Sequence, residues 1–214
     1  RSHCDWSSDV CSSDLKSKIM TALSALNVIH KTGLFGNCQN KEKSELTTVS
    51  EVKDIQIIQI VHYSKSTVKI SSINLDNLKF PEEAMHVNSN NETRILWNGP
   101  NNWIVVSNNK EILSNIKKKC DDKNFAVTDL SHSRTVIELK GNNVKEILKK
   151  GCPINFSEFK LNNCANSIFH GITITIDMIN DNPETFRIFA LRSFGESLYH
   201  SITDASLEDG YNGI

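Results

Sequence analysis

The sequence predicts an α+β protein made of two similar halves, each with an antiparallel sheet covered by helices on one face. Three patterns lead to this prediction: β-branched and alternating runs that mark strands, turn residues that join strands into hairpins, and amphipathic segments with a 3.6-residue period. In order, each half reads strand, helix, hairpin and helix. This βαββα arrangement is ferredoxin-like and differs from a parallel, doubly wound fold.

Composition limits the classes of function. The chain has 214 residues, of which 38% are hydrophobic, enough for a modest core. Its formal net charge of -1 provides no basic field, so we expect neither nucleic acid nor a membrane as a partner. No apolar run approaches the roughly 20 residues of a membrane span and no secretory leader is recognisable, so we expect a cytoplasmic protein. The cysteines and histidines follow no metal-ligand spacing, and we expect no metal site.

The beginning of the chain differs in character from the rest. Residues 1–15 repeat Ser-Ser-Asp without an apolar period and resemble a translated sequencing-adapter remnant, so we treat them as a non-native extension. Residues 16–50 are predicted to form an N-terminal arm. Its part at residues 31–50 is polar and contains a charge cluster at 41–45, so we expect a long loop there.

The first βαββα half is expected at residues 51–127. It begins with the β-branched run at 55–61, which predicts a buried strand. Residues 66–77 are ambiguous: we predict a helix from a weak apolar face, although Val68-Lys69-Ile70 would also fit an extended segment.

A hairpin and a surface helix complete this half. Apolar runs at 94–97 and 103–106 are separated by residues 98–102, whose Gly and Pro favour a turn. Residues 110–119 place apolar side chains on one side and lysines on the other, which predicts a helix.

The second half is expected at residues 128–214. Residues 135–139 alternate as a half-buried strand, and the apolar spacing at 144–148 predicts a helix that ends before Pro153. The clearest alternation, at 172–178, predicts a strand that turns into a second one at 186–191.

The last helix is expected to begin with a capping box. Ser193 and Glu196 have the spacing at which each side chain can bond to the other's backbone N–H. An apolar helical face follows them.

The loop before residue 135 gathers residue types that could bind or react. Asp129, Ser131, His132 and Arg134 supply an acid, a hydroxyl, a base and a cation, so an acid/base or anion site is conceivable. We favour a structural role, in which Asp129 and Ser131 satisfy backbone donors of the turn and Arg134 holds it in place.

A second candidate lies between the last strand and the last helix. The helix start at Arg192 and Ser193 could hold a carboxylate or phosphate under the arginine. A structural arginine paired with an acid of a partner chain would leave the same sequence pattern.

Three further side chains have two possible roles. Trp97 and Trp103 flank the first hairpin and could bracket a flat ligand, but we favour a core or interface role. Cys152 follows a predicted helix end, where the dipole does not favour a reactive thiolate. Since neither a GxGxxG nor a GxxxxGK[ST] motif occurs, we assign no cofactor-binding residue and no catalytic residue.

Four landmarks in order resemble the gamma subunits of sarcosine oxidase. Residues 97–103 are similar to that family's Trp-x-Gly-Pro-x-x-Trp, and residues 129–135 to its Asp-Leu-Ser-His-x-Arg-Thr. Gly151-Cys152-Pro153-Ile154 and Arg192-Ser193-Phe194 follow in the family's order, and the resemblance covers about residues 20–210. The resemblance marks these candidate interface or structural residues: Trp97, Trp103, Asp129, Ser131, Arg134, Cys152, Arg192, Ser193 and Phe194.

The second half also resembles the folate-binding aminomethyltransferase fold, whose members carry a similar Asp-x-Ser-His loop. After His170-Gly171, however, this chain lacks the adjacent aspartates of those transferases. Folate chemistry by this chain is therefore disfavoured. A stand-alone folate-binding one-carbon transferase or regulator is the alternative.

The resemblance implies a non-catalytic subunit of a bacterial heterotetramer. Such a complex oxidises sarcosine to glycine, formaldehyde or methylene-tetrahydrofolate, and hydrogen peroxide. The gamma subunit is expected to contact the alpha subunit directly, with beta and delta subunits elsewhere in the complex. FAD, FMN, NAD and tetrahydrofolate are expected in the partner subunits and not in this chain.

Overall fold

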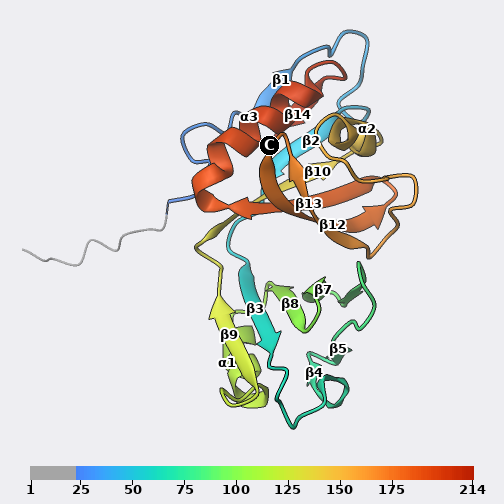
Figure 1. Cartoon of the computed structure of the whole chain (residues 1–214). Helices are drawn as coiled ribbons and strands as arrows, with labels where there is room; N and C mark the ends of the chain where they lie inside the picture. The colour runs from blue at the N-terminus through green and yellow to red at the C-terminus, as the bar shows by residue number, and fades with distance from the viewer. Residues whose placement is uncertain (1–22) are drawn as a thin grey trace, which may run out of the picture.

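Two sheets with helices on their outer faces make up the computed structural model, which describes residues 23–214. Figure 1 shows the larger sheet with α2 and α3 above it and, lower in the view, the smaller sheet with α1 alongside β9. The mixed α+β fold with mostly antiparallel strands agrees with the predicted fold class. Predictions for residues 1–22, including the non-native extension, lie outside the described residues.

The larger sheet has seven strands in the order β1-β14-β2-β10-β13-β12-β11. All neighbouring strands are antiparallel except β14 and β2. Its strands are β1 (Gly33–Phe35), β2 (Thr47–Glu51), β10 (Arg134–Lys140), β11 (Cys164–Phe169), β12 (Ile172–Asp181), β13 (Glu184–Leu191) and β14 (Tyr211–Gly213). Its helical elements are α2 (Val144–Lys149), the 3-10 turn η2 (Arg192–Phe194) and α3 (Gly195–Ser206).

The smaller sheet has five antiparallel strands in the order β6-β7-β8-β3-β9. Its strands are β3 (Gln56–His62), β6 (Val87–Ser89), β7 (Thr93–Gly99), β8 (Asn102–Ser107) and β9 (Phe125–Asp129), and α1 (Ile112–Lys119) covers it. Between β3 and β6 lie the 3-10 turn η1 (Ile70–Ser72) and the small hairpin of β4 (Asn74–Leu75) and β5 (Leu78–Lys79).

The two sheets repeat one order of strands. In the smaller sheet β6, β7, β8 and β3 are neighbours, and in the larger sheet β11, β12, β13 and β10 stand in the same relation. Along the chain, each set begins with a single strand (β3 or β10), continues with an edge strand (β6 or β11) and then a hairpin (β7–β8 or β12–β13). A helix, α1 or α3, follows the hairpin. The chain passes to the smaller sheet between Glu51 and Gln56 and returns between Asp129 and Arg134. The domain limits at residues 51 and 128 remain predictions.

The helix predicted at residues 66–77 is wrong. The segment instead forms η1 and the turn of the β4–β5 hairpin, in which Asp76 and Asn77 both have positive φ. Such a pair suits a two-residue turn between strands, and the flanking Leu75 and Leu78 pack on the core of the smaller sheet. Short extended pieces therefore bury the apolar side chains that suggested a helix.

Two other predictions also need correction. The loop expected at residues 31–50 contains β1 and β2, because Thr47 to Val49 find hydrogen-bonding partners in β10 and β14. The capping box is not formed: α3 has Phe194 at its N-cap and no side-chain bond caps it, because Ser193 lies within η2.

Apolar side chains gather in three layers. One core lies between the larger sheet and α2 and α3, and a second lies between the smaller sheet and α1. A third lies between the two sheets, where Ile57, Leu96 and Val106 meet Val136 and Phe189. Neighbouring residues of a strand point to opposite faces, so a strand that is buried on both faces carries adjacent apolar residues, as Ile57 and Ile58 of β3 do.

Phe186 tests the core beneath α2 and α3. It is fully buried against Phe156 and Phe159, so Phe186→Ala should lower the free energy of unfolding by about 3–5 kcal/mol. Phe194→Ala is the matched control, because that ring is 47% exposed and should cost little. Equilibrium denaturation in urea measures both, and equal losses would contradict this packing.

Candidate functional site

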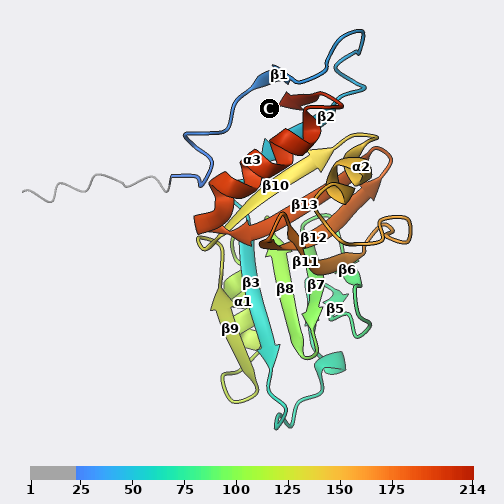
Figure 2. The ribbon, with the colours of Figure 1, turned by 45° about the horizontal axis from the view of Figure 1, so that its top comes forward.

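The contact between the two sheets, called the seam here, is the first candidate site. It is apolar in the middle, as described above, and Figure 2 shows β10, β12 and β13 lying across the ends of β3, β7 and β8. Strands β7 and β11 also run close together along it. The seam is therefore a sandwich of two sheets whose inner faces pack on each other.

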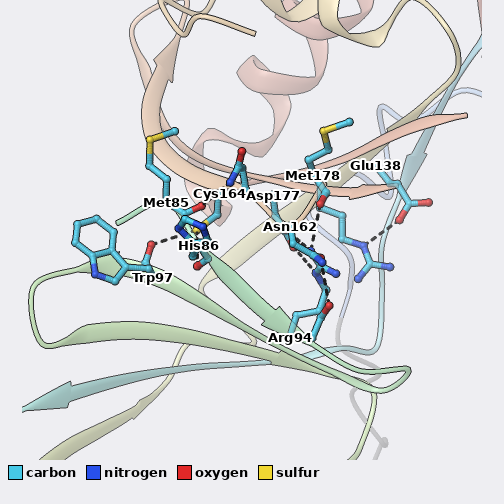
Figure 3. Close-up of polar contacts among 12 residues, drawn as sticks. Met85, His86, Arg94, Trp97, Glu138, Asn162, Cys164, Asp177 and Met178 are labelled. Atoms are coloured by element: carbon cyan, nitrogen blue, oxygen red, sulfur yellow. Dashed lines mark hydrogen bonds and ion pairs between the residues drawn. The ribbon is translucent and has the colours of Figure 1, made fainter. Parts of the chain in front are cut away.

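One buried ion pair joins the sheets across the seam. Arg94 on β7 donates from Nε and Nη2 to the two carboxylate oxygens of Asp177 on β12, each at 2.7 Å. Asp177 is fully buried and Arg94 is 9% exposed. Figure 3 shows the arginine reaching up from the smaller sheet to the strand that carries the acid. This fork-to-fork geometry fixes orientation as well as distance.

Backbone bonds close the edge of the seam beside this pair. Cys164 N–H donates to the Met85 carbonyl at 2.8 Å, and Val87 N–H donates to the Asn162 carbonyl at 2.9 Å. The Cys164 thiol points to the carbonyl of Trp97 at 3.3 Å, as Figure 3 shows. Burial, with the nearby charge of Asp177, raises the pKa of Cys164 to about 12, so this thiol is not a nucleophile.

The second candidate is a pocket of about 470 Å³ at the place where the chain crosses between the sheets. Both crossings, 51–57 and 131–136, contribute to its wall, together with residues 23–27, Lys110 and Arg192. Ser131 and Arg134 were candidates in one loop of the sequence, and Arg192 was a candidate in another. The fold brings all three to one pocket.

Asp129 and Ser131 have the geometry of a structural turn. The Asp129 carboxylate accepts from Ser131 N–H at 2.9 Å and from its hydroxyl at 2.6 Å, which lowers the pKa of Asp129. The Ser131 oxygen in turn accepts from the backbone N–H of Ile57 at 3.0 Å. These bonds tie one crossing to the other.

The pocket wall is rich in cations. The residues that line it include four cations and two acids. The cations are Lys53, Lys110, Arg134 and Arg192, and the acids are Glu51 and Asp54. Arg192 Nη2 donates to the Leu23 carbonyl, and burial lowers the pKa of Arg134.

Glu51 already has partners. Its carboxylate accepts from the Ser24 hydroxyl and lies 3.6 Å from Lys53 Nζ. It is therefore not free to neutralise the arginines.

The other sequence candidates lie apart from this pocket. Trp103 is buried beneath α1, where its Nε1 donates to the Pro81 carbonyl at 2.8 Å, whereas Trp97 packs against the seam. The two indoles thus belong to different clusters. Cys152 is buried, and its thiol contacts the Ser167 hydroxyl at 3.2 Å. Phe194 is exposed at the start of α3.

Sequence reasoning missed the Arg94–Asp177 pair. Both residues lie in strands that it located, and a charged side chain within each apolar strand was the available signal. A charge that is buried in a strand needs an opposite charge as its partner, but only the fold shows that these two strands meet.

Comparison with known proteins places the chain in a family. The model of the sarcosine oxidase, gamma subunit family matches residues 72–208, a range that includes strands of both sheets. The chain belongs to this family.

Two curated relatives, the gamma subunits of sarcosine oxidase from Corynebacterium sp. strains U-96 and P-1, are 27% and 26% identical to it over 119 residues. The aligned region is 54% of this chain and 57% and 58% of those two subunits, so the chain spans a little over half of their length.

Solved structures show the same fold. A chain of the heterotetrameric sarcosine oxidase from Corynebacterium sp. U-96 superposes with a TM-score of 0.70 at 22% identity, covering 78% of this chain and 88% of the other. The aminomethyltransferase T of the glycine cleavage system from Bartonella henselae gives 0.51 at 9% identity, covering 75% and 46%. The predicted relation to the aminomethyltransferase fold is confirmed.

No helix within 23–214 combines the length and hydrophobicity of a membrane span. In the same range, no three His, Cys, Asp or Glu side chains gather as metal ligands.

A double-mutant cycle tests the ion pair. Asp177→Leu leaves the Arg94 guanidinium buried without its partner and should cost about 3–5 kcal/mol in the free energy of unfolding. Arg94→Met should cost a similar amount, and the double variant should cost clearly less than the sum. Additive losses in equilibrium denaturation would show that the two side chains do not depend on each other.

Thiol labelling tests the burial of two cysteines. Burial raises the pKa of Cys120 to about 11 and that of Cys164 to about 12, so almost no thiolate forms at pH 8. Iodoacetamide followed by peptide mass mapping should modify both at least tenfold more slowly than the partly exposed Cys38. Equal rates in the folded protein would contradict the structure, and unfolding in urea should remove the difference.

Proposed function

We propose that this chain is the gamma subunit of a heterotetrameric sarcosine oxidase and supports catalysis by packing on the alpha subunit. The family match over residues 72–208 carries the proposal. Both curated relatives are gamma subunits of sarcosine oxidase, and a chain of a heterotetrameric sarcosine oxidase has the same fold.

The reaction belongs to the whole complex in this proposal. The complex oxidises sarcosine to glycine, a formaldehyde-level carbon and hydrogen peroxide, with tetrahydrofolate as an acceptor of the carbon. FAD, FMN, NAD and tetrahydrofolate are held by the alpha subunit and the other partner chains, and the assembly works in the cytoplasm.

The state of the candidate reactive groups supports a non-catalytic role. Asp177 is neutralised by Arg94, and Asp129 is bonded to Ser131. The thiols of Cys120 and Cys164 are held protonated by burial. These groups serve the fold, so none is available as a general base or nucleophile.

The junction of β13 and α3 is the part of the surface that we assign to the alpha subunit. Leu191 and Phe194 are 44% and 47% exposed there, three positions apart in the chain. A large aromatic side chain beside an aliphatic one is a common anchor at protein interfaces. Phe194 also belongs to Arg192-Ser193-Phe194, one of the four landmarks of the resemblance described above.

Co-expression tests this assignment. Co-expressed with a tagged alpha subunit and the beta and delta subunits of a heterotetrameric sarcosine oxidase, the chain should co-purify in a stable complex. The double variant Leu191→Ser and Phe194→Ser should reduce the recovered chain about tenfold or more, because two apolar anchors are lost.

Leu161→Ser is the matched control, since Leu161 is 42% exposed but lies near the opposite end of β13. Its recovery should equal that of the unchanged chain. Failure of the unchanged chain to co-purify would overturn the proposed function. Equal recovery of the double variant would overturn only the assigned surface.

A further inference from the structure

The arginines that line the pocket at the two crossings lack the carboxylate partners that the other described arginines have. Residues 23–214 contain four arginines. Arg94 is paired with Asp177, and Arg187 donates from Nε to Glu138 at 2.9 Å. The other two, Arg134 and Arg192, have no carboxylate partner among the described residues, and both line the same pocket.

The fold brings these two arginines together. Arg134 begins β10 and lies opposite Leu191 of β13, and Arg192 N–H donates to the Ser133 carbonyl at 2.9 Å. The backbones that carry the two guanidinium groups are therefore hydrogen-bonded neighbours. Two planar forks that face one pocket can bind a carboxylate or phosphate group in the way that single lysines cannot.

The pocket still lacks negative charge when its own acids are counted. Glu51 is engaged by Ser24 and Lys53, which leaves Asp54 as the other acid in the wall that holds Arg134 and Arg192. Burial lowers the pKa of Arg134, so its charge is held at some cost in solvation. An anion from outside the described residues would remove that cost.

The rest of the wall limits the kind of anion. The part-buried Val52 and Ile55 give the pocket an apolar side, with Ile57 and Val136 buried in the core behind them. A volume of about 470 Å³ is within the usual range for small-molecule sites. Inorganic phosphate would leave this apolar side exposed to water. A molecule with an apolar body and one anionic group would cover it.

We propose that this pocket binds a small organic anion whose carboxylate or phosphate group is held by Arg134 and Arg192 and whose apolar body lies against Val52 and Ile55. All of these residues belong to this chain, so binding can be tested on the chain without its partner subunits. A failure of this proposal is therefore distinct from a failure of the proposed assembly.

Titration of the full chain with sodium benzoate tests the proposal, with chloride kept constant. Benzoate supplies a carboxylate on an apolar ring, and the ¹⁵N–¹H signals of the arginine Nε groups report binding at each side chain. The signals of Arg134 and Arg192 should shift saturably, while those of Arg94 and Arg187 should not move. Inorganic phosphate should displace benzoate only at higher concentration.

Variants separate this site from weak binding elsewhere. Arg134→Gln and Arg192→Gln should each weaken benzoate binding about tenfold or more, and Arg134→Lys should fall between the original protein and Arg134→Gln. Lys118→Gln, an exposed charge on α1, should bind as the original does.

Three results would overturn the proposal. The first is a shift of the Arg134 and Arg192 signals that does not saturate with benzoate. The second is an equal shift of the signals of all four arginines. The third is a shift that saturates with phosphate but not with benzoate.

Discussion

The ion pair between Arg94 and Asp177 constrains how the two halves of this protein meet. Either charge alone in the interior would be strongly unfavourable, so the half that carries one needs the half that carries the other. Two parallel bonds of 2.7 Å hold the planes of guanidinium and carboxylate together. Apolar packing alone could accommodate several ways of placing one sheet on another, and this pair selects one of them.

That constraint orders the rest of the molecule. With the inner faces packed on each other, the helices cover the outer faces, and the two crossings of the chain emerge side by side. The crossings are tied by Ser131 and leave a cationic pocket between them. Beside that pocket, the β13–α3 junction exposes the apolar side chains that we propose as the contact with a partner. The seam is therefore structural, whereas the surfaces around it are available for binding.

Local patterns predicted much of this fold from the sequence. The alternation at residues 172–178 and the turn after it gave the β12–β13 hairpin, and the spacing of Ile112 and Ile116 gave α1. Strands β1, β2 and β14 were missed because each is short and is stabilised by pairing with residues far away in the chain. At residues 66–77, a helical spacing of apolar side chains competed with the Asp76-Asn77 turn, and the turn prevailed.

The candidate site could be predicted only in pieces. Arg134 and Arg192 were each singled out, but 57 residues of intervening chain fold between them, and only the pairing of β10 with β13 brings them to one pocket. Asp177 stands at a polar position of an alternating strand, which by itself indicates a solvent-facing side chain. Its burial follows from the second sheet that covers this face.

We propose that this chain supports catalysis by packing on a partner subunit and that the partner subunits carry the groups that oxidise sarcosine. Oxygen consumption with sarcosine measures this most directly, for the purified chain, for the alpha, beta and delta subunits without it, and for the complete mixture. We expect none from the chain alone and a stable rate only from the complete mixture. Turnover of sarcosine or of a tetrahydrofolate derivative by the chain alone would contradict the account.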